Sequence, residues 1–175
     1  MRYVKVEPVK EPHPGYALDA DAYLAVLPEI EADLPEGARR FALDEEHYNF
    51  FGPRCVKDLK LSRVTVSDSS DQISVAVEFA PNQFKHDEGL LIRYSNVNEL
   101  TIEVTASPRK AHVWPDSRRL GDLQLDEILP HEKGLSHEIR LTGGVIQIVA
   151  SDLRAEWRSD AGDPAENVGT GGDAS

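Results

Sequence analysis

Two histidine–glutamate pairs have the residue types that bind metals or transfer protons. These are His131-Glu132 and His137-Glu138, which offer imidazole and carboxylate groups. Their spacing differs from the helical zinc motif, in which two histidines lie four residues apart. His137 shares strand parity with the apolar residues Leu135 and Ile139, so we expect a hydrogen-bonded imidazole in the core. We place His131 in a turn.

A second cluster is the run from Lys85 to Gly89, which puts a histidine and two carboxylates in a loop between predicted strands. Two interpretations stay open. One is an ordinary polar turn that ends in glycine; the other is a weak cation site with His86, Asp87 and Glu88 as ligands. Asp126-Glu127 faces a similar loop and has the same two interpretations.

Cys55 and the missing motifs bear on catalysis. No helix N-terminus or identified histidine partner activates Cys55, so we expect a small buried hydrophobe rather than a reactive thiolate. The sequence has no glycine-rich phosphate loop, Gly-x-Ser-x-Gly elbow, Cys-x-x-Cys pair or dinucleotide fingerprint. These observations favour a protein that is not an enzyme and that needs no cofactor, although some active sites assemble from scattered residues.

The N-terminal part of the chain predicts one helical segment, over residues 19–34. Apolar residues recur at helical spacing from Asp19, which we predict as the N-cap. Pro28 lies inside the series and predicts either a kink or a second helix that starts at Pro28. Pro35 and Gly37 are expected to end the segment.

An aromatic run follows, and strands dominate the remainder. The run from His47 to Pro53 predicts a loop that its rings anchor in the core. Residues 73–80 alternate between apolar and polar types, which is typical of a half-buried strand, and an extra residue near Ser62 or Arg63 predicts a β-bulge. Short connections predict a four-stranded antiparallel meander. The main predicted strands cover about residues 59–66, 73–80, 90–94, 100–106, 123–128, 135–142, 145–150 and 153–157, with a Gly143-Gly144 hairpin turn and a further short strand near residues 3–7.

These elements predict an α+β fold that is predominantly antiparallel β. About seven or eight strands, each with one apolar face, must cover one another as a curled sheet, a sandwich or an open barrel, with the short N-terminal helical segment at one side. We predict a single β-rich domain over residues 1–158. The tail, residues 159–175, is rich in Gly, Ala, Asp and Ser and is predicted to be disordered.

The charge and cysteine content narrow the class of protein. The formal net charge of the 175 residues is −12, which favours solubility and disfavours binding to nucleic-acid phosphates. One cysteine excludes an intramolecular disulfide, and the sequence shows neither a secretory leader nor an apolar run long enough to span a membrane. We therefore expect a soluble, cytoplasmic protein that binds neither nucleic acid nor membrane.

Three stretches carry a family resemblance. The run from Cys55 to Leu61 before the predicted meander, the run from Leu125 to His131 and the Gly-Gly hairpin resemble small uncharacterised bacterial domains. Some of these domains are similar to immunity proteins of polymorphic toxin systems. The resemblance spans about Phe50 to Trp157. It implies a non-catalytic protein that binds and blocks a toxin, and the acidic charge suits a basic nuclease.

The leading hypothesis is a protein-binding module, of the immunity or inhibitor type, that meets a basic partner through acidic loops. The alternative is a β-barrel that binds a small molecule or a metal, with hydrolytic activity as one version of it, and that uses His86, Asp87 or Glu88. A third hypothesis is a structural subunit that self-associates through a sheet edge; the oligomeric state stays open. The predicted partner-binding residues are Glu45, Glu46, Asp87, Glu88, Asp126 and Glu127.

Overall fold

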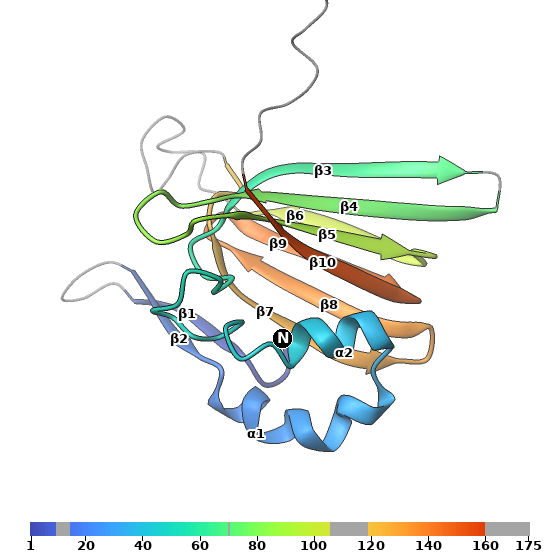
Figure 1. Ribbon diagram of the computed structural model, residues 1–175, viewed down its shortest axis with the longest axis horizontal. Helices are drawn as coiled ribbons and strands as arrows, with labels where there is room; N and C mark the ends of the chain where they lie inside the picture. The colour runs from blue at the N-terminus through green and yellow to red at the C-terminus, as the bar shows by residue number, and fades with distance from the viewer. Residues whose placement is uncertain (10–14, 70, 106–118, 160–175) are drawn as a thin grey trace, which may run out of the picture.

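The computed structural model describes residues 1–9, 15–69, 71–105 and 119–159; the others are drawn in grey in Figure 1. The predicted disordered tail therefore lies outside the described residues, except for Ser159. In chain order the elements are β1 (Lys5–Val9), β2 (Gly15–Asp19), α1 (Asp21–Ile30), a 3-10 turn (Glu31–Asp33), α2 (Glu36–Ala42), β3 (Lys60–Ser69), β4 (Gln72–Ala80), β5 (Gly89–Ser95), β6 (Glu99–Val104), β7 (Leu123–His131), β8 (Gly134–Leu141), β9 (Gly144–Ala150) and β10 (Asp152–Arg158).

The strands form three antiparallel sheets, and none closes into a barrel. One four-stranded sheet has the order β10-β5-β4-β3, the other has the order β6-β9-β8-β7, and β1 and β2 make a separate hairpin. Figure 1 shows the two larger sheets layered over each other. The predicted α+β class with predominantly antiparallel strands is confirmed.

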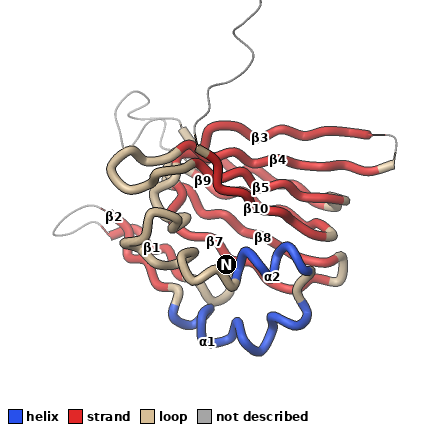
Figure 2. The backbone as a smooth tube through the Cα atoms, in the orientation of Figure 1, coloured by secondary structure: helices blue, strands red, loops and turns tan. Residues whose placement is uncertain are grey.

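One hydrophobic core lies between the two larger sheets. Val75 and Val77 of β4 are buried on one side of it, and Ile146 and Ile148 of β9 are buried on the other. Alternation along each strand puts these side chains on the inner face. Helix α2 packs against β10 and α1 contacts β7, so both helices cover the same side of the two sheets (Figure 2).

The predicted four-stranded meander is correct for three strands and wrong for the fourth. β3, β4 and β5 pair in sequence, but β6 crosses to the other sheet and pairs with β9. The place beside β5 belongs to β10 instead, whose residue Trp157 is opposite Leu90. This exchange of strands links the sheets covalently at two points.

Two local strand predictions are confirmed. The pairing of β3 with β4 shifts between Leu61 and Arg63, where the β-bulge was expected. β8 ends at Leu141 and β9 begins at Gly144, so the Gly-Gly pair does mark a hairpin turn. The bulge keeps both Leu61 and Val64 on the core side of the strand, opposite Phe79 and Val77.

The helical region differs from its prediction in three ways. Asp19 is not the N-cap residue, which is Ala20, although its carboxylate accepts a 2.9 Å hydrogen bond from the N–H of Asp21. Pro28 neither starts a second helix nor ends the first, because α1 runs through it to Ile30. The predicted segment does end at Leu34, which is extended, just before Pro35, but Gly37 lies inside a further helix, α2.

Gly37 fits α2 closely against β10. A Cβ atom at this position would lie 1.8 Å from the Leu153 carbonyl oxygen. The carboxylate of Asp152 accepts hydrogen bonds from the N–H groups of Gly37 (3.1 Å) and Ala38 (3.0 Å). These are two of the donors that the first turn of a helix leaves without partners. The strand therefore fixes the helix start, a long-range effect that composition does not reveal.

Among the described helices, none is long and apolar enough to cross a membrane.

Candidate functional site

The structure divides the six predicted partner-binding carboxylates into two groups. Glu45 and Glu46 lie between α2 and β3, and Asp87 and Glu88 lie between β4 and β5; all four are exposed or half-buried. Asp126 and Glu127 lie within β7 and are buried. The prediction that these last two face a loop is wrong, because β7 continues to His131 and is covered on both faces.

Asp126 is the centre of a buried hydrogen-bonded cluster. Its two carboxylate oxygens each lie 2.8 Å from an imidazole Nε2, one of His47 and one of His137. The Nδ1 atom of His137 lies 2.7 Å from the hydroxyl of Tyr94. His47 is 79 residues from Asp126 in the sequence, so no local motif indicates the cluster. The predicted core position of His137 is confirmed.

The geometry assigns protons and charges in this cluster. His47 Nδ1 lies 3.0 Å from the Phe41 carbonyl oxygen, which only accepts, so both nitrogens of His47 donate and the ring is cationic. Burial alone would lower the pKa of His47, but the Asp126 charge and hydrogen bond raise it above its ordinary value. Burial opposes the charge on Asp126, yet the two imidazoles hold the pKa of this carboxyl far below its usual range. The Asp126 anion and the His47 cation therefore neutralise each other.

The cluster connects three parts of the fold. Tyr94 is in β5 of one sheet, His137 and Asp126 are in the other, and His47 is in the segment after α2. The side chains of both histidines are 0% exposed, and protein groups engage all four ring nitrogens. No nitrogen in this arrangement is offered to a substrate, so the cluster stabilises the fold.

Glu127 points to the other face of β7 and holds the start of the chain. Its carboxylate accepts hydrogen bonds from the backbone N–H groups of Arg2 (2.5 Å), Tyr3 (2.6 Å) and Val4 (2.8 Å). Three donors on one carboxylate explain why this buried acid is tolerated. The sequence alone could not have paired residues that lie more than a hundred positions apart.

The alternative cation site at His86, Asp87 and Glu88 does not form. His86 is buried; its Nε2 donates to the Cys55 carbonyl oxygen (2.9 Å) and its Nδ1 accepts from the N–H of Asn82 (3.2 Å). Burial lowers the pKa of His86. Across the described residues, no three His, Cys, Asp or Glu side chains gather as a metal site. Cys55 is buried, as predicted, and burial raises the pKa of its thiol.

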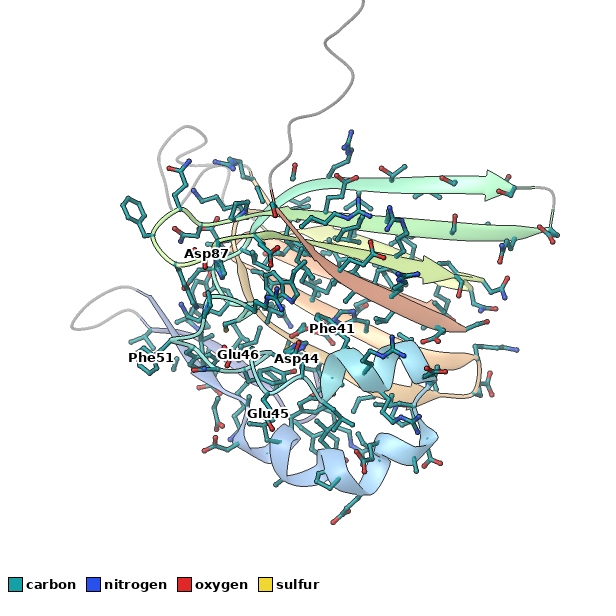
Figure 3. All side chains as sticks on the ribbon, in the orientation of Figure 1. Phe41, Asp44, Glu45, Glu46, Phe51 and Asp87 are labelled. Atoms are coloured by element: carbon teal, nitrogen blue, oxygen red, sulfur yellow. The ribbon has the colours of Figure 1, made fainter. Side chains whose placement is uncertain are left out.

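His86 instead joins two loops, residues 43–58 and residues 81–88, which we call the paired loops. Beside the contact between His86 and Cys55, Arg54 forms a 3.0 Å ion pair with Glu88. Lys85 Nζ donates to the Lys57 carbonyl oxygen at 3.1 Å. The paired loops therefore form one surface at an end of the sheets (Figure 3).

Two phenylalanines project from this surface. Phe51 and Phe84 are each 99% exposed, one on each of the paired loops. The aromatic run from His47 to Pro53 was predicted to anchor its loop in the core. This is correct for His47, Tyr48 and Phe50, which pack in or against the core, and wrong for Phe51. Phe84 was not singled out from the sequence.

An asparagine side chain fixes the backbone turn before each of the two phenylalanines. Asn49 Oδ1 accepts a hydrogen bond from the N–H of Phe51 (3.4 Å), and Asn82 Oδ1 accepts one from the N–H of Phe84 (3.2 Å). An asparagine that bonds to the backbone two residues ahead makes an Asx-turn. The repeated Asn-x-Phe spacing in two predicted loops is therefore the sequence signal that reveals this surface.

The charged groups on the paired loops that lack an ion-pair partner are acidic. The cations of the paired loops have acidic partners, since Glu88 pairs with Arg54, and Asp58 lies 2.6 Å from Lys57 and 3.5 Å from Lys85. Glu45 and Asp87 have no ion-pair partner among the described residues, and they are exposed. Glu46 bonds only to the neutral amide of Asn49, beside the turn that carries Phe51. Unpaired charge on this surface is therefore negative.

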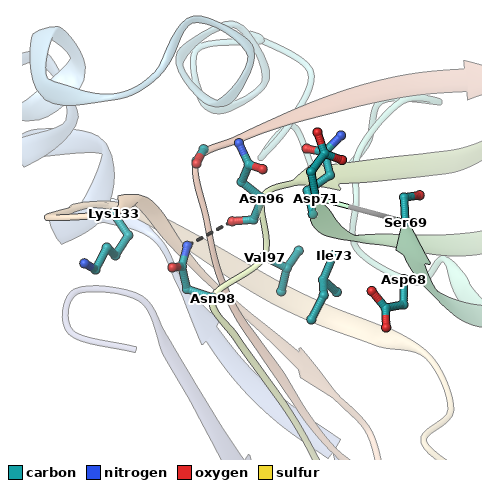
Figure 4. A pocket seen from close by; sticks show the side chains of 10 residues that line it. Asp68, Ser69, Asp71, Ile73, Asn96, Val97, Asn98 and Lys133 are labelled. Carbon is teal, nitrogen blue, oxygen red and sulfur yellow. Dashed lines mark hydrogen bonds between the residues drawn. The ribbon is translucent and has the colours of Figure 1, made fainter.

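A polar hollow of about 540 Å³ opens near the turn between β3 and β4 (Figure 4). Its lining includes Asp68 and Asp71 from that hairpin and one cation, Lys133. A 2.9 Å hydrogen bond from the Asn98 amide to the Asn96 carbonyl oxygen shapes its wall. None of the predicted site residues lines it.

Comparison with known proteins gives no relatives: no family model, no curated protein and no solved structure matches this chain.

Proposed function

We propose that this protein is a non-catalytic protein-binding module, and that the paired loops contact a partner with a basic surface. The observation that carries the proposal is the full exposure of Phe51 and Phe84 on two loops that bond to each other. Single exposed apolar residues are common, but two large rings on one hydrogen-bonded surface are typical of an interface.

Burial of the two rings against a partner would contribute a large binding free energy. Burying a phenylalanine side chain contributes about 1.5–3 kcal/mol, and in the free protein neither ring contributes it. Aromatic residues at the centre of an interface commonly dominate binding in this way. Phe51 and Phe84 are therefore proposed as the anchors of the partner.

The loops are ordered before binding, which also favours this function. The Asx-turns at Asn49 and Asn82 fix the backbone at each phenylalanine, and His86 is bonded to both loops. An ordered surface loses less conformational entropy when a partner arrives. The paired loops thus suit a rigid partner rather than one that must be wrapped.

The charge of the surface supports a basic partner. Glu45, Glu46 and Asp87 lie on the paired loops without cationic partners among the described residues. Charges of opposite sign on the rim of an interface steer association and select partners. An inhibitor or immunity protein of a basic toxin is the kind of binding module that these features suit.

The proposal is tested by capture from a lysate of the source cell with four forms of the immobilised full chain. These are the wild type, F51S/F84S, E45Q/E46Q/D87N, and the control V66S/I73S, which removes exposed apolar side chains from β3 and β4. The expected result is a basic protein that the wild type and the control retain equally. F51S/F84S should lose it at least tenfold, and the charge variant should bind more weakly and with less sensitivity to salt. Equal retention by the wild type and F51S/F84S would refute the proposal.

A further inference from the structure

β6 lies at an edge of its sheet. It pairs with β9 over its whole length, Glu99 to Val104, and no other described strand pairs with its second side. An edge strand leaves a row of backbone N–H and C=O groups that another chain can pair with. The second side of β6 therefore presents the backbone groups that another strand needs for pairing.

The inner face of β6 is apolar and only partly covered. Leu100, Ile102 and Val104 point to the core side, because Leu100 and Ile102 are opposite the buried residues Ile148 and Ile146. Yet Ile102 is 43% exposed and Val104 is 58% exposed. The helices cover the opposite side of the sheets, where β7 and β10 lie (Figure 1). Within the described part of the chain, no helix covers the space between the sheets beside β6.

The outer face of β6 is acidic. Glu99 and Glu103 are exposed, with Thr101 between them, and their neighbours on β9 are the uncharged residues Val149 and Val145. Neither glutamate forms an ion pair with another described residue. The strand therefore alternates acidic residues on one face with apolar residues on the other.

β3 is the other edge strand on this side of the sheets, and it has features that discourage pairing with another chain. It contains the β-bulge between Leu61 and Arg63, and Arg63 is already paired with Glu78 at 3.0 Å. Asp68, opposite Ile73, puts a charge on the inner face. Bulges and inward charges are devices that protect an edge from pairing. β6 has no bulge, proline or lysine, so it is the edge left open.

We propose that β6 is a second binding site, which takes an extended segment of another protein as a fifth strand of the sheet. The segment alternates apolar side chains, which cover Ile102 and Val104, with basic side chains, which face Glu99 and Glu103. Backbone pairing supplies affinity in strand addition, and alternate side chains supply specificity. Pairs of opposite charge on neighbouring strands further stabilise the pairing. This site is separate from the paired loops and does not depend on their function.

The test uses a synthetic peptide with the sequence Thr-Lys-Val-Lys-Val-Lys-Thr and the ¹⁵N-labelled full chain. The expected result is saturable shifts of the amide resonances of residues 99–105 and slower hydrogen exchange there. A peptide with the same residues in the order Thr-Lys-Val-Val-Lys-Lys-Thr, which places valine and lysine on both faces of the strand, is the control for alternation, and it should bind at least tenfold more weakly. I102K and E103K should each weaken binding of the first peptide at least tenfold.

Two variants separate this site from the other surfaces. V66K on β3 and F51S/F84S on the paired loops should bind the peptide as the wild type does. The proposal is overturned if the peptide shifts resonances of residues 49–58 or 81–88 instead of β6. It is also overturned if no shift occurs at millimolar peptide, or if the only effect is self-association of the chain.

Discussion

The Nε2 atom of His86 lies 2.9 Å from the carbonyl oxygen of Cys55, and this one hydrogen bond joins the loop that carries Phe84 to the loop that carries Phe51. The other nitrogen of the same ring accepts from Asn82, which also makes the turn before Phe84. A histidine that resembles a metal ligand in the sequence therefore organises a surface. The expected consequences can be measured one by one.

His86 should stabilise both paired loops. In H86A the buried carbonyl of Cys55 loses its donor, which costs about 1–3 kcal/mol in the free energy of unfolding. Urea denaturation measures this loss, and hydrogen exchange should become faster in residues 49–58 and 81–88 together. H131A, at an exposed histidine, is the control and should change stability by less than about 0.5 kcal/mol. Unchanged exchange in either loop of H86A would show that the ring does not join them.

Asp126 should be among the most sensitive positions of the fold. D126A leaves the His47 cation buried without its counter-charge, and breaking a buried pair in this way costs about 3–5 kcal/mol. Thermal and urea unfolding at pH 6 measure the change. E45Q removes an exposed carboxylate and serves as the comparison, with an expected change below about 0.5 kcal/mol. A D126A protein as stable as E45Q would contradict the charge assignment.

The cluster predicts a stability optimum in weakly acidic solution. The folded-state pKa of His47 is raised, so its contribution is complete below the unfolded value of about 6.5 and is lost as pH rises through the folded pKa. The pKa of Asp126 is lowered, so its contribution is complete above about 3.9 and is lost as pH falls towards the folded value. The wild type should therefore exceed H47Q in stability most strongly between about pH 4 and 6.5. A stability difference between the wild type and H47Q that grows as pH rises above this window would contradict the raised pKa of His47.

Phe51 and Phe84 should contribute nothing to folding. Both side chains are fully exposed, so F51S/F84S should match the free energy of unfolding of the wild type within about 0.5 kcal/mol. Urea denaturation with intrinsic tryptophan fluorescence measures it. F41S is the contrast, because Phe41 is buried against His47 and its loss should cost several times more. A marked loss of stability in F51S/F84S would mean that the two rings serve the fold.

Local patterns in the sequence predict the strands well and the helices less well. Alternation identifies β4, and the change of parity identifies the bulge at Leu61 and Arg63. Helix α2 was not predicted, because Pro35 and Gly37 are typical of a helix end. Its start is stabilised by Asp152, more than a hundred residues away. The path of β6 into the second sheet likewise depends on its pairing with β9, which no local signal reveals.

The candidate surface is predictable only in part. Loop positions for Glu45, Glu46, Asp87 and Glu88 follow from the residues that interrupt the strand patterns. Asp126 was assigned to a loop rather than to the core parity of a strand. The two histidines that make its burial favourable are distant in the sequence. Phe51 was placed in the core because aromatic residues usually lie there. The Asn-x-Phe spacing is a local signal of the turn before Phe51, but the structure is needed to show that its ring points to solvent.

Photo-crosslinking in the source cell tests the central claim most directly. The photoreactive residue p-benzoylphenylalanine replaces Phe51 or Phe84 in the full chain, with Val66 on β3 as a control position that is 55% exposed. Both phenylalanine positions should crosslink to the same basic protein, and Val66 should not. Crosslinks from Phe51 and Phe84 to different proteins, or to the same set as Val66, would contradict the proposal that the paired loops bind one partner.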